Sequence, residues 1–303
     1  MYDLIIIGSG PAGYSAGIYA TRYNLNVLVI GQIEGGMASL AHQVENYPGL
    51  PQITGIELMK KFKDQATKSG AKIISDLVVN IKKTDDIFSV QTKSETYKSK
   101  TIILAMGTER RKINIPGEKE FLGKGLSYCV TCDGMFFKNK TVAVIGGGDS
   151  ALQAVIQLSE ICKKVYLIYA KEIPDAMPTW VERANSEADK IIQIASNTLT
   201  KIEGTNTVEK VILEKEFNNS NELLVDGVFV EIGAVPNSVL LDKLGVLIDD
   251  CKYIIVDQFQ QTNVKGIFAA GDITTNSGKF AQIITASNEG AIASFTAFKY
   301  LKK

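Results

Sequence analysis

The chain has 303 residues, a length that suits two domains better than one. With 45% hydrophobic and 22% charged residues, and 33 basic residues balancing 33 acidic ones, it has no net charge that favours nucleic acid or an anionic membrane. No apolar run reaches the roughly 18 residues that span a bilayer, and the chain opens on a strand rather than on a secretory signal. We therefore expect a cytoplasmic protein that binds neither nucleic acid nor membrane.

The first segment predicts a βαβ unit that binds a dinucleotide. An apolar strand at 4–7 precedes a glycine-rich turn at 8–13, a helix of small residues and a second strand at 27–30. Glycine lets the backbone approach a pyrophosphate closely, and the amides at the helix N-terminus stabilise its negative charge. The residues expected at the pyrophosphate are Gly8, Gly10, Pro11, Ala12 and Gly13.

The ribose contact of this site stays open. In the usual unit an acidic residue ends the second strand, but here Ile30 is followed by Gly31 and Gln32, with Glu34 nearby. Residues near 73–104 alternate and contain turn signals, which predicts a β-meander closing on an apolar strand at 102–105.

The second segment repeats the first. A strand at 142–145 leads into a glycine-rich turn at 146–151, a helix through Leu158 and a strand at 165–168. The third segment, from near Pro236, ends in a helix at about 282–301 and is too short to form its own sheet. We predict an α/β fold of two Rossmann-like, three-layer dinucleotide-binding domains, with residues 113–236 inserted into a first domain of residues 1–112 and 237–303.

Cys129 and Cys132 form a CxxC pair directly before Asp133. A helix N-terminus stabilises a thiolate, the species that attacks a disulfide, and Asp133 can act as acid or base as protons move. Structural zinc takes four Cys or His ligands, whereas the chain has one histidine, His42, and no second CxxC. We expect a redox pair and no metal.

The remaining candidate residues carry weaker signals. His42 is the only histidine available as a base, and we favour a structural or flavin-adjacent role for it. Cys162 lies in a predicted helix and Cys251 in a turn, and we expect both to be inert. Trp180 is expected to pack in the core, with a surface for a cofactor or partner as the alternative.

These motifs together resemble the low-molecular-weight thioredoxin reductases over essentially the whole chain. The position of the CxxC in the second domain separates this family from the glutathione reductase class. The stretches that carry the resemblance, in order, are 8–13, Glu45-Asn46-Tyr47-Pro48-Gly49, 129–134, 146–151, Ile232-Gly233-Ala234-Val235-Pro236-Asn237 and Phe268-Ala269-Ala270-Gly271-Asp272.

The resemblance implies FAD as cofactor, thioredoxin as disulfide substrate, a homodimer, and a central domain that rotates between two poses. It also implies that Cys132 lies nearer the flavin and that Cys129 attacks thioredoxin. The further FAD-binding residues that it implies are Gly36, Asn46, Ala105, Gly107, Gly271, Asp272, Ala281 and Gln282.

The chain departs from the family where NADPH would bind. Members that use NADPH carry three arginines after the second strand of the central domain, and here those positions hold Ala170, Lys171 and Asp175, with Glu172 between them. Two glutamates that often follow the second glycine turn are replaced by Gln153-Ala154, and an arginine near the flavin is replaced by Ala281. The chain thus resembles the branch that does not use NADPH, in which ferredoxin is a donor.

Reduction potentials allow ferredoxin as the donor. A ferredoxin near −400 mV lies about 130 mV below thioredoxin near −270 mV, or roughly 6 kcal/mol for two electrons. Three alternatives stay open. They are an NADH-dependent reductase with Glu172 on the adenosine ribose, a flavin-linked dithiol oxidase acting on a small molecule, and a non-enzymatic flavin-binding or redox-sensing protein.

Overall fold

The computed structural model describes residues 1–237, 240–241 and 244–302. The chain divides into two compact units, Met1–Glu109 with Val235–Lys303 (unit 1) and Arg110–Ala234 (unit 2). It leaves unit 1 through strand β7 (Thr108–Arg110) and returns through β16 (Ala234–Pro236), and these two strands pair with each other. The predicted insertion of one α/β domain into another is confirmed, with crossings at 109/110 and 234/235 where the sequence suggested 112/113 and 236/237.

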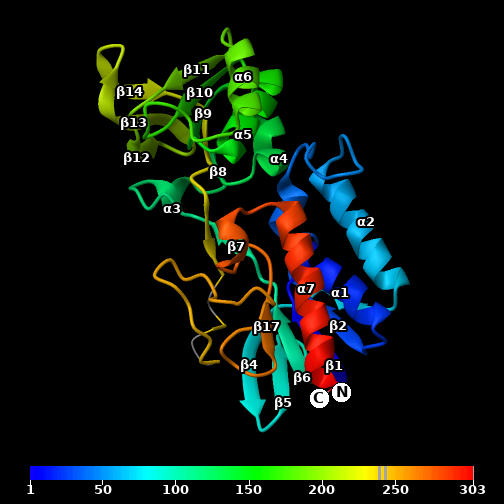
Figure 1. Cartoon of the computed structure of the whole chain (residues 1–303). Coiled ribbons are helices and arrows are strands. Elements are labelled where there is room, and N and C mark those ends of the chain that lie inside the picture. The colour runs from blue at the N-terminus through cyan, green and yellow to red at the C-terminus, as the bar shows by residue number, and fades with distance from the viewer. Residues whose placement is uncertain (238–239, 242–243, 303) are drawn as a thin grey trace. The chain divides into compact units, whose positions relative to one another are not determined.

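Unit 1 is a parallel sheet with an antiparallel extension (Figure 1). Its described strands follow the order β3-β2-β1-β6-β5-β4, with β17 also paired to β6. The strands are β1 (Tyr2–Ile7), β2 (Val27–Ile30), β3 (Lys72–Ile74), β4 (Val78–Thr84), β5 (Ile87–Thr92), β6 (Thr96–Leu104) and β17 (Ile267–Ala269). The helices are α1 (Pro11–Arg22), η1 (Gly36–Leu40), α2 (Gly55–Lys68), η3 (Asn276–Lys279) and α7 (Ile283–Leu301).

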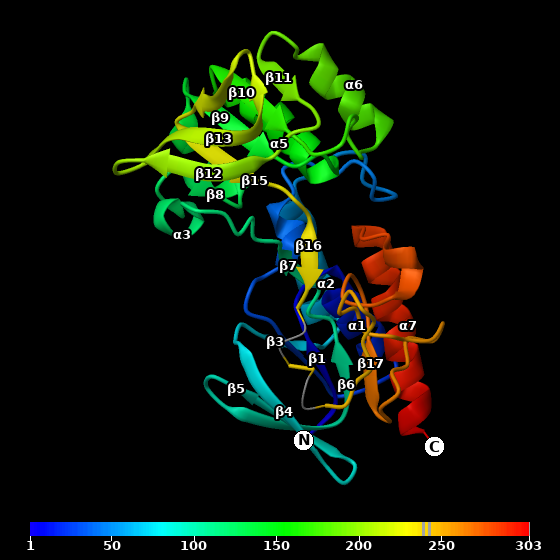
Figure 2. The same cartoon turned by 90° about the vertical axis from the view of Figure 1, so that its left-hand side faces the viewer.

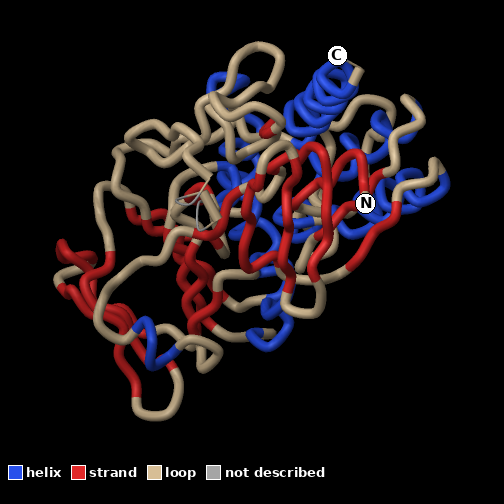
Figure 3. The backbone as a smooth tube through the Cα atoms, turned by 90° about the horizontal axis from the view of Figure 1, so that it is seen from below, coloured by secondary structure: helices blue, strands red, loops and turns tan. Residues whose placement is uncertain are grey.

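Alternation along β1 divides the core of unit 1 into two layers. Leu4 and Ile6 face α1 and α7, whereas Ile5 and Ile7 face the meander of β4 and β5, because successive strand residues point to opposite faces. In Figure 3 the strands lie in a row near the N-terminus, and the C-terminal helix lies along one side of them. The third sequence segment completes this sheet through β17, whose Ile267 pairs with Ile102 of β6.

Unit 2 repeats this plan. Its described parallel sheet has the order β11-β10-β9-β15-β8, with a three-stranded antiparallel sheet, β12-β13-β14, beside it. The strands are β8 (Leu126–Ser127), β9 (Thr141–Ile145), β10 (Lys164–Ile168), β11 (Ile191–Ile194), β12 (Leu199–Gly204), β13 (Val208–Phe217), β14 (Ser220–Leu224) and β15 (Gly227–Val230). The helices are α3 (Glu118–Phe121), α4 (Val130–Asp133), η2 (Gly134–Phe137), α5 (Asp149–Ile161) and α6 (Pro178–Ser186).

The two faces of the unit 2 sheet are covered differently. Val142 and Val144 of β9 pack against α5 and α6, and Ala143 and Ile145, which alternate with them, pack against β12 and β13. Figure 2 shows α5 and the antiparallel strands around the central β9 and β10. Each unit is therefore a three-layer sandwich that places a glycine turn at the carboxyl end of its first parallel strand. In the described part of the chain, no helix is long and apolar enough to cross a membrane.

Candidate active site

The first glycine turn joins β1 to α1. Gly8 has a φ of +119°, and a Cβ atom on it would lie 2.0 Å from the carbonyl oxygen of Ala105. A Cβ atom on Gly13 would lie 1.9 Å from the carbonyl oxygen of Gly8. The fold itself therefore requires these two glycines, because a side chain on Gly8 would collide with the backbone that follows β6, and one on Gly13 would push α1 away from the turn.

Gly10 differs from its neighbours. It is the N-cap of α1 with φ −85° and ψ −169°, a conformation that any residue adopts. Among the described residues, a Cβ atom on Gly10 would meet only the carbonyl oxygen of Gly35, at 3.8 Å. Since the packing of the protein leaves this space open, the site fits the pyrophosphate of FAD, held by the N-terminal amides of α1. Pro11 and Ala12 form the first turn of this helix.

Two predicted cofactor residues from opposite ends of the chain meet in unit 1. The side-chain amide of Asn46 donates to Oε1 of Gln282 at 2.9 Å. Gln282 is also the N-cap of α7, and Ala281 directly precedes it. Gly36 begins η1 with a φ of +56°, and Gly107 follows β6 with a φ of +61°. The fold thus joins Asn46 to Gln282, and it places Gly36 against Gly10 of the first glycine turn.

Gly271 and Asp272 follow β17 against the first turn of α1. Gly271 has a φ of +82°, and its Cβ atom would lie 2.9 Å from that of Ala12. Glu289 of α7, a residue that the sequence analysis missed, is 2% exposed and accepts hydrogen bonds from the Gly271 amide, the Thr274 hydroxyl and the Ser277 hydroxyl at 2.8, 2.9 and 2.5 Å. Burial, and then the charge of Glu289, raise the pKa of Asp272 to about 6.

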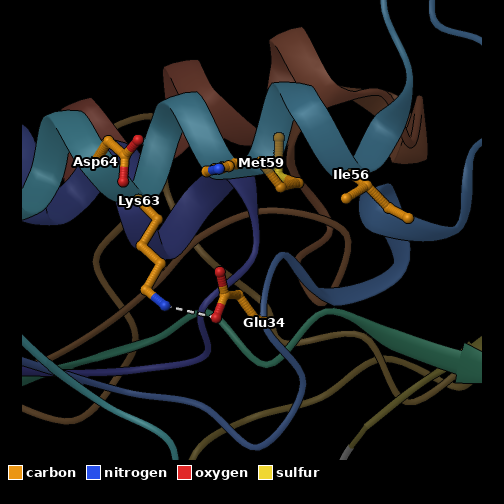
Figure 4. Close-up of a pocket in the computed structure, with 6 residues that line it drawn as sticks. Glu34, Ile56, Met59, Lys63 and Asp64 are labelled. Carbon is orange, nitrogen blue, oxygen red and sulfur yellow. Dashed lines mark hydrogen bonds and ion pairs between the residues drawn. The ribbon is translucent and has the colours of Figure 1, made fainter.

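The acidic residue nearest the end of β2 is already paired. The carboxylate of Glu34 accepts from Nζ of Lys63 on α2 at 2.5 Å, beside a small pocket lined also by Ile56, Met59, Lys60 and Asp64 (Figure 4). Rossmann folds bind the ribose after this strand. A ribose contact by Glu34 would have to share its carboxylate with Lys63.

The redox pair lies in unit 2. Cys129 and Cys132 form a disulfide with a Cα–Cα distance of 5.3 Å. Cys129 is the N-cap of α4, a single helical turn, and its Sγ accepts from the Cys132 amide at 3.2 Å. Cys132 is exposed and Cys129 is half-buried, so a disulfide substrate can reach the pair from solvent. Asp133 ends the same turn, and its amide donates to the Cys129 carbonyl at 3.1 Å.

Ser127 of β8 links Asp133 to the redox turn, and the sequence analysis did not identify it. Its hydroxyl donates to Oδ2 of Asp133 at 2.6 Å and accepts from the Cys129 amide at 3.0 Å. The sequence held one usable signal, a serine two residues before the first cysteine. Serine side chains often form hydrogen bonds with backbone groups a few residues away along the chain.

The other candidate residues do not belong to the redox turn. Cys162 is buried, and burial raises the pKa of its thiol to about 11, so it stays protonated at neutral pH. Cys251 and His42 are exposed in unit 1. Trp180 packs partly against the core of unit 2, with the Arg183 guanidinium 4.8 Å from its ring centre. Within the described ranges, no group of three or more His, Cys, Asp or Glu side chains could hold a metal ion.

The second glycine turn reproduces the geometry of the first. Gly146 has a φ of +136°, and its Cβ atom would lie 2.1 Å from the Glu231 carbonyl oxygen. Gly148, the N-cap of α5, has φ −92° and ψ −178°, and its Cβ atom would meet only the Asp175 carbonyl oxygen at 3.8 Å in the part of the chain that the structure describes. The space that a pyrophosphate would need is therefore kept here as well.

The segment after β10 is held against this turn by its backbone. The Asp175 amide donates to the Gly147 carbonyl at 2.7 Å, and the Met177 amide donates to Oδ1 of Asp149 at 2.7 Å. The side chain of Asp175 accepts from Nζ of Lys171 at 2.6 Å, and this ion pair lowers the pKa of Asp175. Lys171, which stands where the resemblance implies an arginine, is thus paired with the aspartate four residues later.

Comparison with known proteins agrees with this architecture. The family model for pyridine nucleotide-disulphide oxidoreductases matches residues 2–290. The thioredoxin reductase of Treponema pallidum (strain Nichols) is 42% identical over 99% of this chain and 97% of its own. Among solved structures, the thioredoxin reductases of Lactococcus lactis and T. acidophilum are 33% and 37% identical, with TM-scores of 0.95 and 0.94, each over 100% of this chain and 99% of the other. The chain therefore belongs to the low-molecular-weight thioredoxin reductases, flavoprotein disulfide oxidoreductases with FAD as cofactor and a CxxC redox-active disulfide.

Proposed function

We propose that this protein reduces the disulfide of thioredoxin with electrons that reach Cys129 and Cys132 from FAD. The observation that carries the proposal is the accessible disulfide of unit 2 with Asp133 on the same turn. Bound FAD would supply the two-electron chemistry that opens this disulfide. Gly8, Gly10 and Gly13, with the Asn46–Gln282 and Gly271–Asp272 pairs, would hold it.

The residues of the redox turn can supply every proton and both electrons of the thiol–disulfide exchange. The Cys129 thiol of the reduced pair passes its proton to Asp133, and the Cys129 thiolate attacks the thioredoxin disulfide. A mixed disulfide forms, and the departing thioredoxin thiolate takes the proton from Asp133. Asp133 next takes the proton of the Cys132 thiol, and the Cys132 thiolate attacks Cys129. The Cys129–Cys132 bond forms again, and the second thioredoxin thiolate takes the former Cys132 proton from Asp133. Two electrons and two protons have passed to thioredoxin.

The surface beside the pair suits a protein substrate. Met135 and Phe136 follow the redox turn and are 66% and 75% exposed, a large apolar exposure for two adjacent residues. Exposed apolar groups next to a reactive centre are typical of a docking site. We propose that thioredoxin docks against these two side chains.

For the electron donor, we propose reduced ferredoxin rather than NADPH. A 2′-phosphate needs cations that reach its oxygens, and forked arginine contacts serve best. The segment at the second glycine turn offers Lys171, whose charge Asp175 neutralises, and Glu172 adds a further negative charge. NADH lacks this phosphate, so the NADH-dependent reductase is the first alternative and the dithiol oxidase the second.

One titration series tests the donor and the substrate separately. The purified flavoprotein is mixed anaerobically with NADPH, NADH or reduced ferredoxin, and the loss of flavin absorbance is followed in a stopped-flow instrument. We expect fast bleaching by ferredoxin and slow or no bleaching by NADPH. Bleaching by NADPH at micromolar affinity would return the protein to the NADPH-dependent class. Thioredoxin is then added, and the appearance of its thiols tests the substrate.

The redox pair has its own test. Cys129→Ser and Cys132→Ser variants should each lose thioredoxin reduction while keeping bound flavin, because the first glycine turn lies in the other unit. A double variant that still reduces thioredoxin would overturn the mechanism. The homodimer implied by the resemblance and the cytoplasmic location expected from the sequence are proposals too. Light scattering on the purified protein measures the first, and cell fractionation measures the second.

A further inference from the structure

Ser127 occupies the last residue of β8, where the strand turns into the redox pair. Its side chain is buried, with 4% of the residue exposed. The hydroxyl lies between Asp133 Oδ2, at 2.6 Å, and two backbone groups of Cys129, the amide at 3.0 Å and the carbonyl at 3.3 Å. It therefore contacts both the cysteine and the carboxylate to which we assign the proton transfers.

The hydroxyl has one hydrogen and two acceptors within reach. When Asp133 is ionised, the hydrogen goes to its carboxylate, because a charge-assisted bond at 2.6 Å is stronger than a neutral one at 3.3 Å. When Asp133 is protonated, its carboxyl group can donate to the Ser127 oxygen, and the Ser127 hydrogen then has the Cys129 carbonyl as acceptor. Both protonation states of Asp133 thus keep a hydrogen-bond partner without movement of the main chain.

We infer that Ser127 is a positioning residue for the disulfide exchange, and that it holds the Asp133 carboxyl group at the redox turn through both protonation states. The inference rests on the proposed role of Asp133. Ser159 provides a contrast within the same unit. It is 1% exposed, but its hydroxyl donates to the carbonyl of Ile156 in its own helix, at 2.7 Å. Ser159 therefore fills space, whereas Ser127 bonds an ionisable group.

The test is a double-mutant cycle on the complete flavoprotein. Dithionite-reduced Ser127→Ala, Asp133→Asn and double variants are mixed anaerobically with thioredoxin disulfide and, in parallel, with the aromatic disulfide dithionitrobenzoate, and thiol formation is timed. We expect Ser127→Ala and Asp133→Asn each to slow the exchange by about tenfold or more. The double variant should be no slower than Asp133→Asn, because Ser127 acts through that carboxylate. Ser127→Thr, which keeps the hydroxyl, should restore most of the rate.

Flavin content and the thermal midpoint of each variant control for folding, and Ser159→Ala controls for loss of a buried hydroxyl. The inference is wrong if Ser127→Ala keeps the wild-type rate, or if it slows Asp133→Asn by the same factor as it slows the wild type. A wild-type rate in Asp133→Asn would instead refute the proposed role of Asp133. If only dithionitrobenzoate is reduced, thioredoxin is the wrong substrate, and the cycle with the small disulfide still decides for or against Ser127.

Discussion

The Asp175→Arg variant should convert the second glycine turn into a site that accepts NADPH. Asp175 is anchored by its backbone amide on the Gly147 carbonyl, so the side chain can change without loss of that bond. The substitution replaces a carboxylate by a guanidinium and releases Lys171 from its ion pair. Both cations then lie on the segment where the resemblance implies that the family's arginines bind the 2′-phosphate.

The gain of a charge-assisted contact sets the expected size of the effect. One charge-assisted contact to a phosphate changes an affinity by about 10- to 100-fold, so NADPH should gain at least about tenfold over NADH. The exposed Lys171–Asp175 pair adds little to stability, and we expect the thermal midpoint to stay near that of the wild type.

The assay is flavin reduction by NADPH and NADH over a range of concentrations, for the wild type and for two variants. Glu216→Arg is the matched control, because it makes the same charge change at an exposed position of β13, on the other side of the unit 2 sheet. It should leave the ratio of the two nucleotide affinities unchanged. Our reasoning about the 2′-phosphate fails if Asp175→Arg shifts that ratio no more than Glu216→Arg does.

Three further predictions follow from the geometry. Gly10→Val should fold but lose flavin, because its side chain enters the open space where the pyrophosphate would lie, whereas Gly13→Val should unfold at a lower temperature, because its Cβ atom meets a carbonyl oxygen. Absorbance spectra measure the flavin and thermal melts measure the stability, and a fully yellow Gly10→Val protein would contradict the site. Phe136→Asp should raise the KM for thioredoxin about tenfold and leave dithionitrobenzoate reduction unchanged; an equal loss with both disulfides would argue against docking at this residue. The pKa of Asp272 is raised to about 6 in the folded protein, so the contribution of its protonated carboxyl group to stability is present below pH 3.8 and is lost as the pH rises through 6. Between pH 4 and pH 7 the free energy of unfolding of the wild type should therefore fall by up to roughly 3 kcal/mol relative to that of Asp272→Asn. Parallel pH profiles of the two proteins in denaturant titrations would refute that assignment.

Local patterns in the sequence were sufficient for the architecture. The apolar strands at 4–7 and 142–145, each followed by glycines at fixed spacing, predicted both Rossmann-like units, because the backbone at Gly8 and Gly146 turns with a positive φ that favours glycine. The CxxC at 129–132 likewise predicted a disulfide, because two intervening residues bring the cysteines within bonding reach. These features depend on neighbours along the chain, and neighbours are visible in a sequence.

Only the tertiary structure decided contacts between distant residues. The bond between Asn46 and Gln282 joins side chains 236 positions apart, and the buried Glu289 holds the Gly271 turn from a helix that follows it. The backbone bond from Asp175 to Gly147, which holds the Lys171–Asp175 pair at the second glycine turn, also needed the fold, because α5 and β10 separate its two residues along the chain. Such contacts depend on how the strands order themselves in the sheet, and long-range pairing leaves no periodic signal in a single sequence.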